Sequence, residues 1–434
     1  MIATKQIRLL HGKEGLTLRV PASATVLESA QVPALPDTAA AVRDALANPI
    51  GTPPLRELLA ARQARTAAIT ISDITRPVPN RQFLPAILKE LNEAGIDDSS
   101  IVIVVGTGMH RPSTEVERRA LVGGDILARV DVIDHRADDP ATLVKISDEP
   151  PVSICRRFVA ADFRIVTGYI EPHFMAGFSG GRKGVCPALV DLPTIQRFHG
   201  YDTLCEPAAD NGLLEGNPCH RIAMKVAQAV GVDFLFNVAL TRSREIAGIY
   251  CGDLEQAHLA GCRDVAKWSA AHVEEPYDLV ITNGGGYPLD QTFYQTVKGM
   301  CTALPALHAG STLLQVSQCA EQIGSPAYAE LMLTYDNNWG RFLADIAACS
   351  HQTHLDQWQF QMHTRVLERI GVKKLRFVSD GIPPELQKRL SVTPVLGDGD
   401  APTRAHRAID DFVAAHGDAR IAVIPDGPYT LLQR

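Results

Sequence analysis

Side chains that can move protons or bind a metal are concentrated in one segment, residues 168–200, which reads GYIEPHFMAGFSGGRKGVCPALVDLPTIQRFHG. The segment carries His173, Lys183 and His199. A neutral imidazole binds borderline metals such as nickel and zinc, and it also titrates near physiological pH. The spacings form no standard zinc pattern, and too few protein ligands are gathered here for an ordinary structural metal site. If a metal binds, a group other than a side chain must therefore complete its coordination.

The middle of this segment, GFSGGRKG at residues 177–184, combines flexible glycine amides with two adjacent basic side chains. Such amides and cations suit a phosphate or another anion. Gly177 and Lys183 have the spacing of a P-loop, but Arg182 and Gly184 stand where that pattern requires a glycine and a hydroxyl. Two alternatives stay open at this point: a nucleotide-dependent phosphotransferase or ligase that uses this loop, and a non-catalytic protein that only binds a small anion.

Two further segments place polar side chains after apolar runs that are typical of buried strands. Asp73 and Arg76 lie in SDITRPVPN, and His110 lies in GTGMHRPST. Open α/β sheets build their sites at the carboxyl ends of their strands. This placement favours a functional role for both segments and for the glycine-rich one.

A fourth candidate is the stretch DQTFYQTVKGM. On a helix, Tyr294 and Lys298 share one face at four-residue spacing and Gln295 lies beside them, so this face is suited to clamp a carboxylate. The alternative is a solvated helix flank. Trp358, in HLDQWQFQMH, is of a type that more often packs in a core or covers a site.

The elements that must position these side chains alternate along the chain. Apolar, β-rich runs fit strands buried on both faces, and they lie at residues 67–73, 99–108, 163–170, 233–240, 277–285, 310–317, 374–381 and 419–427. Helical patterns lie between them, such as NPCHRIAMKVAQAVG, with Asn217 as the cap and Pro218 at the first helical position. This order predicts an α/β protein with mostly parallel sheets.

The length of the chain and one polar break predict two domains. A chain of 434 residues exceeds what one hydrophobic core usually supports. The sequence AAHVEEPYD, at residues 270–278, separates a long helical stretch from a fresh strand. We therefore predict an N-terminal α/β domain over residues 1–272 and a C-terminal α/β domain over residues 273–434. The sequence leaves open whether the last strand returns to the first domain.

The overall composition excludes several classes of protein. The net charge is −7 and no long run of Lys or Arg interrupts it, so the electrostatic footprint of a nucleic-acid-binding protein is missing. The start lacks the features of a secretion signal, and nowhere do about 18 apolar residues run together, so we expect a cytoplasmic protein without a membrane partner. The nine cysteines are scattered and never form C-x-x-C, which favours reduced, mostly buried thiols.

Several motifs together resemble one known family. In chain order, SDITRPVPN, GTGMHR, GYIEPHFMAGFSGGRKGVCPAL, the pair His199–Gly200, GNPCH and YQTVKGM resemble the nickel-dependent lactate racemase family, whose wider superfamily contains other 2-hydroxyacid racemases and epimerases. The matches extend from about residue 69 to 300, and Trp358 is a weaker match further on. One departure is Ala188, because the family commonly has a glycine after the proline of GVCPAL.

The resemblance implies an active site in the cleft between two α/β domains, and a cofactor. This cofactor is a nickel-pincer nucleotide, the nickel complex of pyridinium-3-thioamide-5-thiocarboxylic acid mononucleotide. The resemblance implies that Lys183 is covalently attached to it through a thioamide, that His199 supplies the protein ligand to nickel, and that His110 and His173 are the acid/base pair. Further cofactor contacts are expected from Asp73, Ser179, Gly180, Gly181 and Arg182. Substrate contacts are expected from Arg76, Tyr294, Gln295, Lys298 and Trp358.

The resemblance also implies a reaction. One histidine removes the hydroxyl proton of a 2-hydroxy acid while the 2-hydrogen leaves as a hydride to the cofactor. The 2-keto acid then rotates and takes the hydride on its other face. Two bases are needed because the enantiomers present their hydroxyls to opposite sides of the site. The implied partners are a small 2-hydroxy acid, by default lactate, and the enzymes that make the cofactor. The sequence does not choose between lactate, malate and a sugar acid, and it does not give the oligomeric state.

Overall fold

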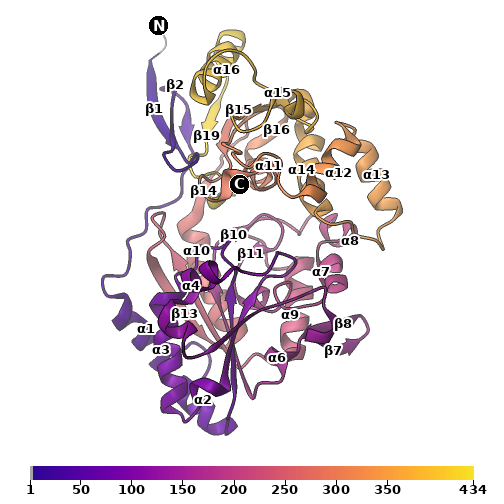
Figure 1. Ribbon diagram of the computed structural model, residues 1–434. Helices are drawn as coiled ribbons and strands as arrows, with labels where there is room; N and C mark the ends of the chain where they lie inside the picture. Colours follow the sequence, from indigo (N-terminus) through magenta and orange to yellow (C-terminus); the bar gives the residue numbers. More distant parts are fainter. Residues whose placement is uncertain (1–2) are drawn as a thin grey trace.

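Two six-stranded sheets organise the computed structural model, which describes residues 3–434 (Figure 1). The first sheet has the order β13 (Ile246–Gly252), β12 (Phe234–Leu240), β9 (Phe163–Tyr169), β4 (Ala67–Ser72), β5 (Ile101–Gly106) and β6 (Asp131–Asp134). The second has the order β18 (Thr393–Pro394), β17 (Leu375–Val378), β16 (Leu307–Val316), β15 (Tyr277–Asn283), β19 (Ile421–Val423) and β3 (Thr25–Val26). All neighbouring strands in these two sheets are parallel except β12 and β13. The predicted α/β class with mostly parallel sheets is confirmed.

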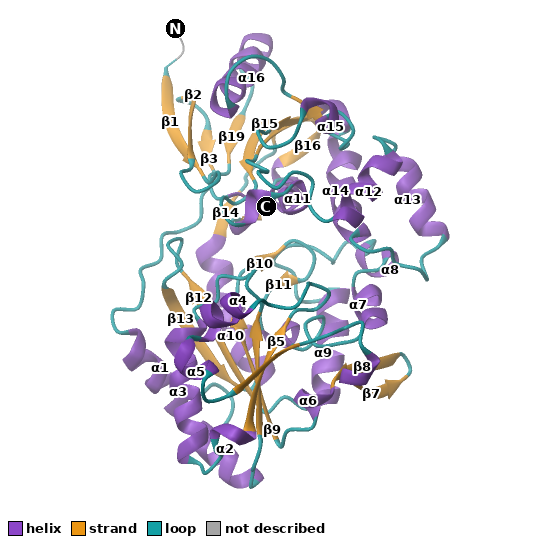
Figure 2. Ribbon diagram, viewed as in Figure 1, coloured by secondary structure: helices purple, strands orange, loops and turns teal. Residues whose placement is uncertain are grey.

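Helices cover both faces of the first sheet, as Figure 2 shows. Side chains of a strand point alternately to its two faces. Ile69 and Ile71 pack with the buried face of α3 (Asn80–Glu93), whereas Ala68 lies in a second cluster with α9 (Pro218–Val230). This burial on both sides explains why the strands read as continuous apolar runs.

The second sheet also has a covered face on each side. One side lies under α16 (Ala401–His416) and a hairpin of β1 (Thr4–Leu9) and β2 (Leu16–Pro21). The other side lies under α11 (Phe293–Thr302) and α14 (Gln357–Ile370). Parallel strands need crossover helices, and these helices supply them.

The start of the chain differs from the expected first domain of residues 1–272. The strand β3 pairs with β19 of the second sheet, and the apolar face of the β1–β2 hairpin packs on Leu279 and Ile281 of β15. The physical reason is that β19 would otherwise leave a free sheet edge and an uncovered apolar face. The run at 419–427 forms β19 in the second sheet. A further short strand, β20 (Leu431–Gln433), pairs with β14 (Ala270–His272) between the two sheets.

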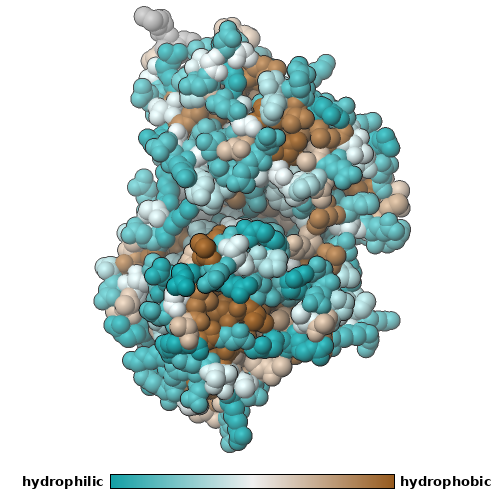
Figure 3. All heavy atoms as spheres, viewed as in Figure 1, coloured by the Kyte–Doolittle hydropathy of each residue, from teal (hydrophilic) through white to brown (hydrophobic). Residues whose placement is uncertain are grey.

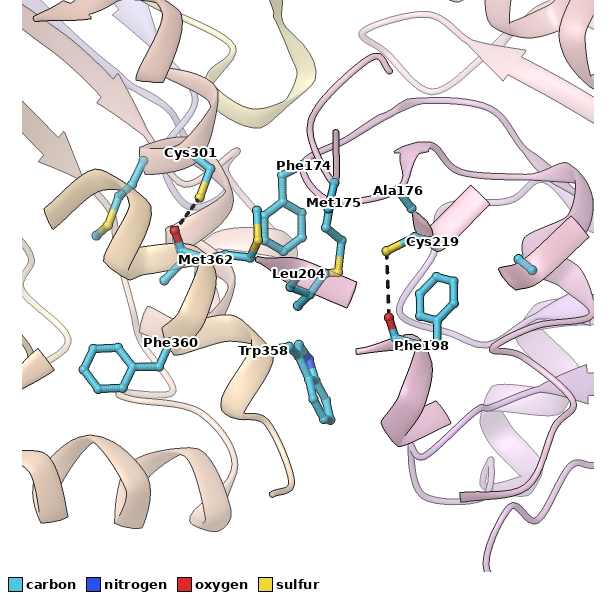
Figure 4. Close-up of a cluster of buried hydrophobic side chains, with 14 of the residues drawn as sticks. Phe174, Met175, Ala176, Phe198, Leu204, Cys219, Cys301, Trp358, Phe360 and Met362 are labelled. Carbon is cyan, nitrogen blue, oxygen red and sulfur yellow. Dashed lines mark hydrogen bonds between the residues drawn. The ribbon is translucent and has the colours of Figure 1, made fainter. Parts of the chain in front are cut away.

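The two halves share one continuous core. Figure 4 shows Phe174 and Met175 from the first half close to Met362 and Trp358 of α14, and all four belong to one buried cluster. In the space-filling view, hydrophobic side chains gather in separate patches on the two halves of the visible face (Figure 3). Within the described part of the chain no helix is long and apolar enough to cross a membrane.

The local predictions are confirmed where the sequence signals were strong. Each of the predicted apolar runs contains a strand. Asn217 caps α9, because its side chain accepts a hydrogen bond of 3.1 Å from the His220 amide, and Pro218 is the first helical residue. All nine cysteines are free, and only Cys205 and Cys349 are exposed.

Candidate active site

Loops at the carboxyl ends of three neighbouring strands form one wall of the site. They follow β4, β5 and β9, and the last of them contains β10 (Pro172–His173), β11 (Gly177–Phe178), the short 3-10 helix η3 (Gly181–Gly184) and α7 (Leu192–Phe198). The helices α11 and α14 of the second half form the facing wall. A pocket between the halves is lined by residues that include Arg76, His173 and Phe174 from one side and Lys298 and Tyr429 from the other.

His110 is paired with a carboxylate. Its Nδ1 lies 2.6 Å from Oδ2 of Asp73, whose other oxygen accepts a hydrogen bond of 2.6 Å from the Thr75 hydroxyl. Burial by itself raises the pKa of Asp73, but the hydrogen bond and charge of His110, together with Thr75 and Arg76, outweigh it and hold this pKa below its usual range. Because the carboxylate accepts the Nδ1 proton, we assign the lone pair of the neutral ring to Nε2.

His173 has the opposite pattern of hydrogen bonds. Its Nδ1 faces the backbone amides of Met175 and Ala176, at 3.4 and 3.3 Å. An amide can only donate here, so Nδ1 accepts and we assign the proton of the neutral ring to Nε2. Burial lowers the pKa of His173 well below its usual value, and the nearby Lys183 and Lys298 charges add to this. His173 is therefore a neutral hydrogen-bond donor in the free protein.

Burial shifts the Lys183 amine toward its uncharged form. It lies in η3, and burial lowers its pKa well below the usual value, with further lowering from Arg76 and Arg182. A neutral amine has the lone pair that a nucleophile needs, whereas an ammonium group does not. The side chain is thus suited to form a covalent bond.

His199 offers one free ring nitrogen. It follows α7, and its Nδ1 lies 2.9 Å from the Ile195 carbonyl oxygen, to which it donates. Burial lowers the pKa of His199 to about 3, so the ring is neutral and its Nε2 carries a lone pair. The Trp358 ring packs beside it, with 4.7 Å between ring centroids. A neutral histidine whose other nitrogen is fixed by a backbone carbonyl is typical of a metal ligand.

Two basic side chains line the cavity together with His173. Arg76 comes from the loop after β4 and Lys298 from α11. Burial and, to a smaller extent, the Arg76 charge outweigh the opposing Glu171 charge and lower the pKa of Lys298 to about 7. A bound carboxylate would neutralise both charges, so the pair is suited to hold a small organic acid. Of the other predicted substrate contacts, Tyr294 accepts a 2.8 Å hydrogen bond from Trp358, and Gln295 has a buried side-chain oxygen that lacks a partner among the described residues.

The glycine-rich loop is tied into the protein more tightly than the sequence predicts. The amide of Gly181 donates to the Asn237 side chain at 2.7 Å, and the Ser179 hydroxyl donates to the Tyr169 carbonyl at 2.9 Å. At Gly180 and Gly181, φ is 74° and 54°, and a Cβ on Gly181 would lie 2.5 Å from the His258 ring. Only glycine fits there. No α-helix follows the loop directly, so it lacks the helix N-terminus that a P-loop uses.

Arg182 is fully buried and bonded within the protein. Its guanidinium donates to the Ala176 carbonyl at 2.7 Å and lies 3.1 Å from Nε2 of His258. The arginine therefore fixes the loop that carries Lys183. Its expected contact with a cofactor stays a prediction, as do those of Ser179 and Gly180.

Sequence reasoning missed two acidic residues of the site. Glu171 is the only acidic side chain among the described residues that line the cavity. Asp356 precedes α14, is 9% exposed, and lies within hydrogen-bonding reach of the Tyr294 hydroxyl. Glu171 stands two residues before His173 in the segment that we singled out, and this proximity was an available signal. Asp356 had none, because its neighbours come from distant parts of the chain.

Ala188 fits the loop because its neighbour is a glycine. Gly106 ends β5, and a Cβ placed there would lie 2.9 Å from the Ala188 Cβ. The Gly108 amide donates to the Ala188 carbonyl at 3.1 Å, so this contact helps to hold the loop that leads to His110.

The fold and the cleft define a class: a two-domain α/β protein that gathers polar side chains from the strand ends of one half and the helices of the other. A model of the lactate racemase N-terminal domain matches residues 11–212, and a model of the lactate racemase C-terminal domain matches residues 273–431. The chain belongs to the lactate racemase family.

Individual relatives agree with this assignment. The chain is 33% identical to lactate racemase of Thermoanaerobacterium thermosaccharolyticum over 389 residues, which cover 89% of this chain and 88% of the relative. It is 34% identical to lactate racemase of Lactiplantibacillus plantarum over 390 residues, which cover 89% of each. The structure of the T. thermosaccharolyticum lactate racemase apoprotein superposes with a TM-score of 0.89 at 30% identity and covers 99% of this chain and 100% of that one.

Proposed function

We propose that this protein is a 2-hydroxyacid racemase or epimerase, with lactate as the default substrate, that works with a nickel-pincer nucleotide attached to Lys183. The relatives of similar length are named lactate racemases, which supports a racemase in this chain. The observation that carries the proposal is the combination of a buried amine at Lys183, whose pKa burial lowers, with a single free imidazole nitrogen at His199.

The donor set fits such a cofactor. Among residues 3–434, no group of three or more His, Cys, Asp or Glu side chains is placed to hold a metal ion. One histidine alone holds nickel poorly, so a metal at His199 requires further ligands from a non-protein group. Lys183 would hold that group covalently and His199 would bind the nickel through Nε2. When bound, the cofactor supplies a carbon that accepts a hydride from the 2-carbon of the substrate and returns it.

The residues of the chain would do the remaining work. Arg76 and Lys298 bind the carboxylate and so orient the 2-carbon. His110, whose Nδ1 proton is held by Asp73, is suited to remove the hydroxyl proton through Nε2. His173 is suited to donate a hydrogen bond from Nε2 to the same oxygen as it becomes a carbonyl. For the opposite enantiomer the roles would be exchanged, with His173 as the base; this requires the His173 ring to carry a lone pair, not a proton, on Nε2 before it accepts the hydroxyl proton.

The two alternatives lose support in this site. A nucleotide-dependent phosphotransferase or ligase requires open loop amides, yet those of Ser179, Gly181 and Lys183 are already bonded within the protein. A protein that only binds an anion has no need for a buried lysine of lowered pKa beside two histidines. Cytoplasmic location and partnership with cofactor-making enzymes remain part of the proposal.

Racemisation of a 2-deuterated substrate tests the proposal. The protein is coexpressed with cofactor-making enzymes, its attached mass and nickel are measured, and enantiopure 2-hydroxy acids labelled with deuterium at carbon 2 are supplied in ordinary water. We expect racemisation with the deuterium retained at carbon 2, because it leaves and returns as a hydride. Complete exchange for solvent hydrogen would instead show proton abstraction from carbon. Loaded protein that racemises no 2-hydroxy acid would refute the proposal altogether.

A further inference from the structure

A path of side-chain contacts runs through the second half to His199. The indole N–H of Trp358 donates to the Tyr294 hydroxyl oxygen at 2.8 Å, and the Trp358 ring lies 4.7 Å from the His199 ring at an interplanar angle of 32°. In Figure 4, Trp358 lies between α14 and Phe198, the residue before His199. The direction of the Tyr294 hydroxyl therefore controls the indole that packs on His199.

Asp356, at the start of this path, has an energetically unfavourable backbone conformation and side-chain environment. Its φ is 65°, a left-handed conformation that is uncommon for residues other than glycine, and its side chain is nearly buried. Both features cost free energy, so other contacts must offset them. The residue occupies the N-cap position of α14, yet its side chain makes no capping hydrogen bond. Helix capping therefore does not explain it.

The contacts of the Asp356 carboxylate point into the site. The Ser325 hydroxyl donates to one of its oxygens, and the Tyr294 hydroxyl is within hydrogen-bonding reach. The tyrosine oxygen accepts from Trp358, so its own proton is free to be donated to Asp356. A carboxylate here orients the tyrosine hydroxyl in one direction, and that orientation presents the lone pair to the indole.

We propose that Asp356 is a positioning residue that acts through Tyr294 and Trp358 to fix the ring of His199. The path joins the halves, because Asp356, Tyr294 and Trp358 belong to the second and His199 to the first. A consequence concerns substrate binding. Since Tyr294 donates its hydroxyl proton to Asp356, its oxygen can only accept a hydrogen bond from a bound substrate. The positioning of the His199 ring by Asp356 does not depend on the proposed function, whereas its effect on catalysis rests on it.

The first test uses protein without cofactor. The chain has three tryptophans, so protein labelled with 15N in tryptophan shows three indole N–H signals, and Trp358→Phe identifies the relevant one. We expect Asp356→Gly, which suits the positive φ, to shift the Trp358 signal and speed its solvent exchange by about tenfold, the value of one ordinary hydrogen bond. Tyr294→Phe should move the same signal.

Two variants separate positioning from general damage. Asp356→Asn tolerates the backbone conformation and keeps an oxygen acceptor, so it should largely restore the Trp358 signal. Ser325→Ala removes the other partner of the carboxylate and should leave the signal in place. If Asp356→Gly does not fold, Asp356→Ala replaces it. An unchanged Trp358 signal in the folded glycine or alanine variant, beside a shifted signal in Tyr294→Phe, overturns the proposal.

The second test uses loaded protein. Asp356→Gly should lower kcat about tenfold and leave KM for the acid nearly unchanged, because Arg76 and Lys298 are untouched. Asp356→Asn should recover most of kcat. A wild-type kcat in the glycine variant contradicts the role. If the wild-type loaded protein has no racemase activity, the proposed function fails, while the indole signal still decides the role of Asp356.

Discussion

Replacing Asp73 by asparagine should disable His110 as a base and leave the fold in place. The carboxylate holds the Nδ1 proton at 2.6 Å, which keeps the lone pair on Nε2. An asparagine that turns its NH₂ group toward the ring reverses this, because Nδ1 must then accept and Nε2 carries the proton. The His110 side chain is 54% exposed, so the ion pair itself stabilises the protein little.

The size of the effect follows from the role of the base. General acid–base help is worth about 10² to 10⁴ in rate, which is about 3 to 5 kcal/mol of transition-state stabilisation. We expect Asp73→Asn to lower kcat for net racemisation by a factor in this range, from either enantiomer, since each turnover uses both histidines. Thr75→Val is the matched control. It removes the other hydrogen bond of Asp73 and keeps the carboxylate, so it should cost less than about tenfold.

Two measurements check this reasoning. Chiral detection of both enantiomers gives the rates, and 15N NMR of the histidine rings in cofactor-free protein gives the tautomer of His110 directly. The expected result is an Nδ1-protonated ring in the wild type and an Nε2-protonated ring in Asp73→Asn. The reasoning is refuted if the tautomer changes while the rate does not, or if Thr75→Val is as slow as Asp73→Asn.

Four further outcomes follow from the same geometry. Lys183→Arg should fold but carry no attached cofactor mass after coexpression with cofactor-making enzymes, because a permanently charged guanidinium is no nucleophile; an attached mass on this variant would place the tether elsewhere. Carboxylate binding should weaken as pH rises through about 7, the pKa of Lys298, so KM should rise over this range. In Lys298→Arg, KM should depend less on pH. A wild-type KM that is independent of pH contradicts this prediction. Gly106→Ala should lower the free energy of unfolding by about 1 to 3 kcal/mol, because the new methyl group overpacks against Ala188. In urea unfolding, the double variant with Ala188→Gly should recover most of this loss. If the two losses add instead, the contact between these positions is refuted. The pKa of Asp73 lies below its unfolded value of about 3.9, so its stabilising contribution is present above that pH and is lost as pH falls below it; Asp73→Asn should lose less stability than the wild type between about pH 4 and 2.

The sequence predicted those parts of the fold that depend on local patterns. Runs such as the one at 101–106 are apolar throughout because helices cover both faces of their sheet, and this makes them readable without any knowledge of their partners. The same logic led to the candidate site, since His110 and His173 follow such runs. The sequence did not predict that the β1–β3 segment belongs to the second sheet, because this depends on pairing with β19, nearly four hundred residues later in the chain.

The features of the site that the sequence did not predict depend on long-range contacts. Arg182 stands in a sequence that suggests a phosphate loop, but its guanidinium is buried against His258, 76 residues away in sequence. Asp73 was expected near the cofactor, and the structure shows it as the partner of His110, 37 residues away. No spacing rule relates such pairs, because the topology of the sheet brings them together.

The asymmetry of the two histidines has a consequence for when the site is active. A racemase needs a base on each side of the carbon, yet the pKa of His173 in the free protein lies far below its usual value. Burial is the largest cause, followed by the charges of Lys183, Lys298 and Arg76. Under the proposed function, a Lys183 tethered through a thioamide would carry no charge, and a bound carboxylate would offset the charges of Lys298 and Arg76. Of the five causes, which include the charge of His199, three would then be weakened once cofactor and substrate are both in place, and this would favour a higher pKa of His173 in the loaded site. If His173 is one of the two bases, as proposed, its proton transfer would therefore depend on a site that holds both cofactor and substrate.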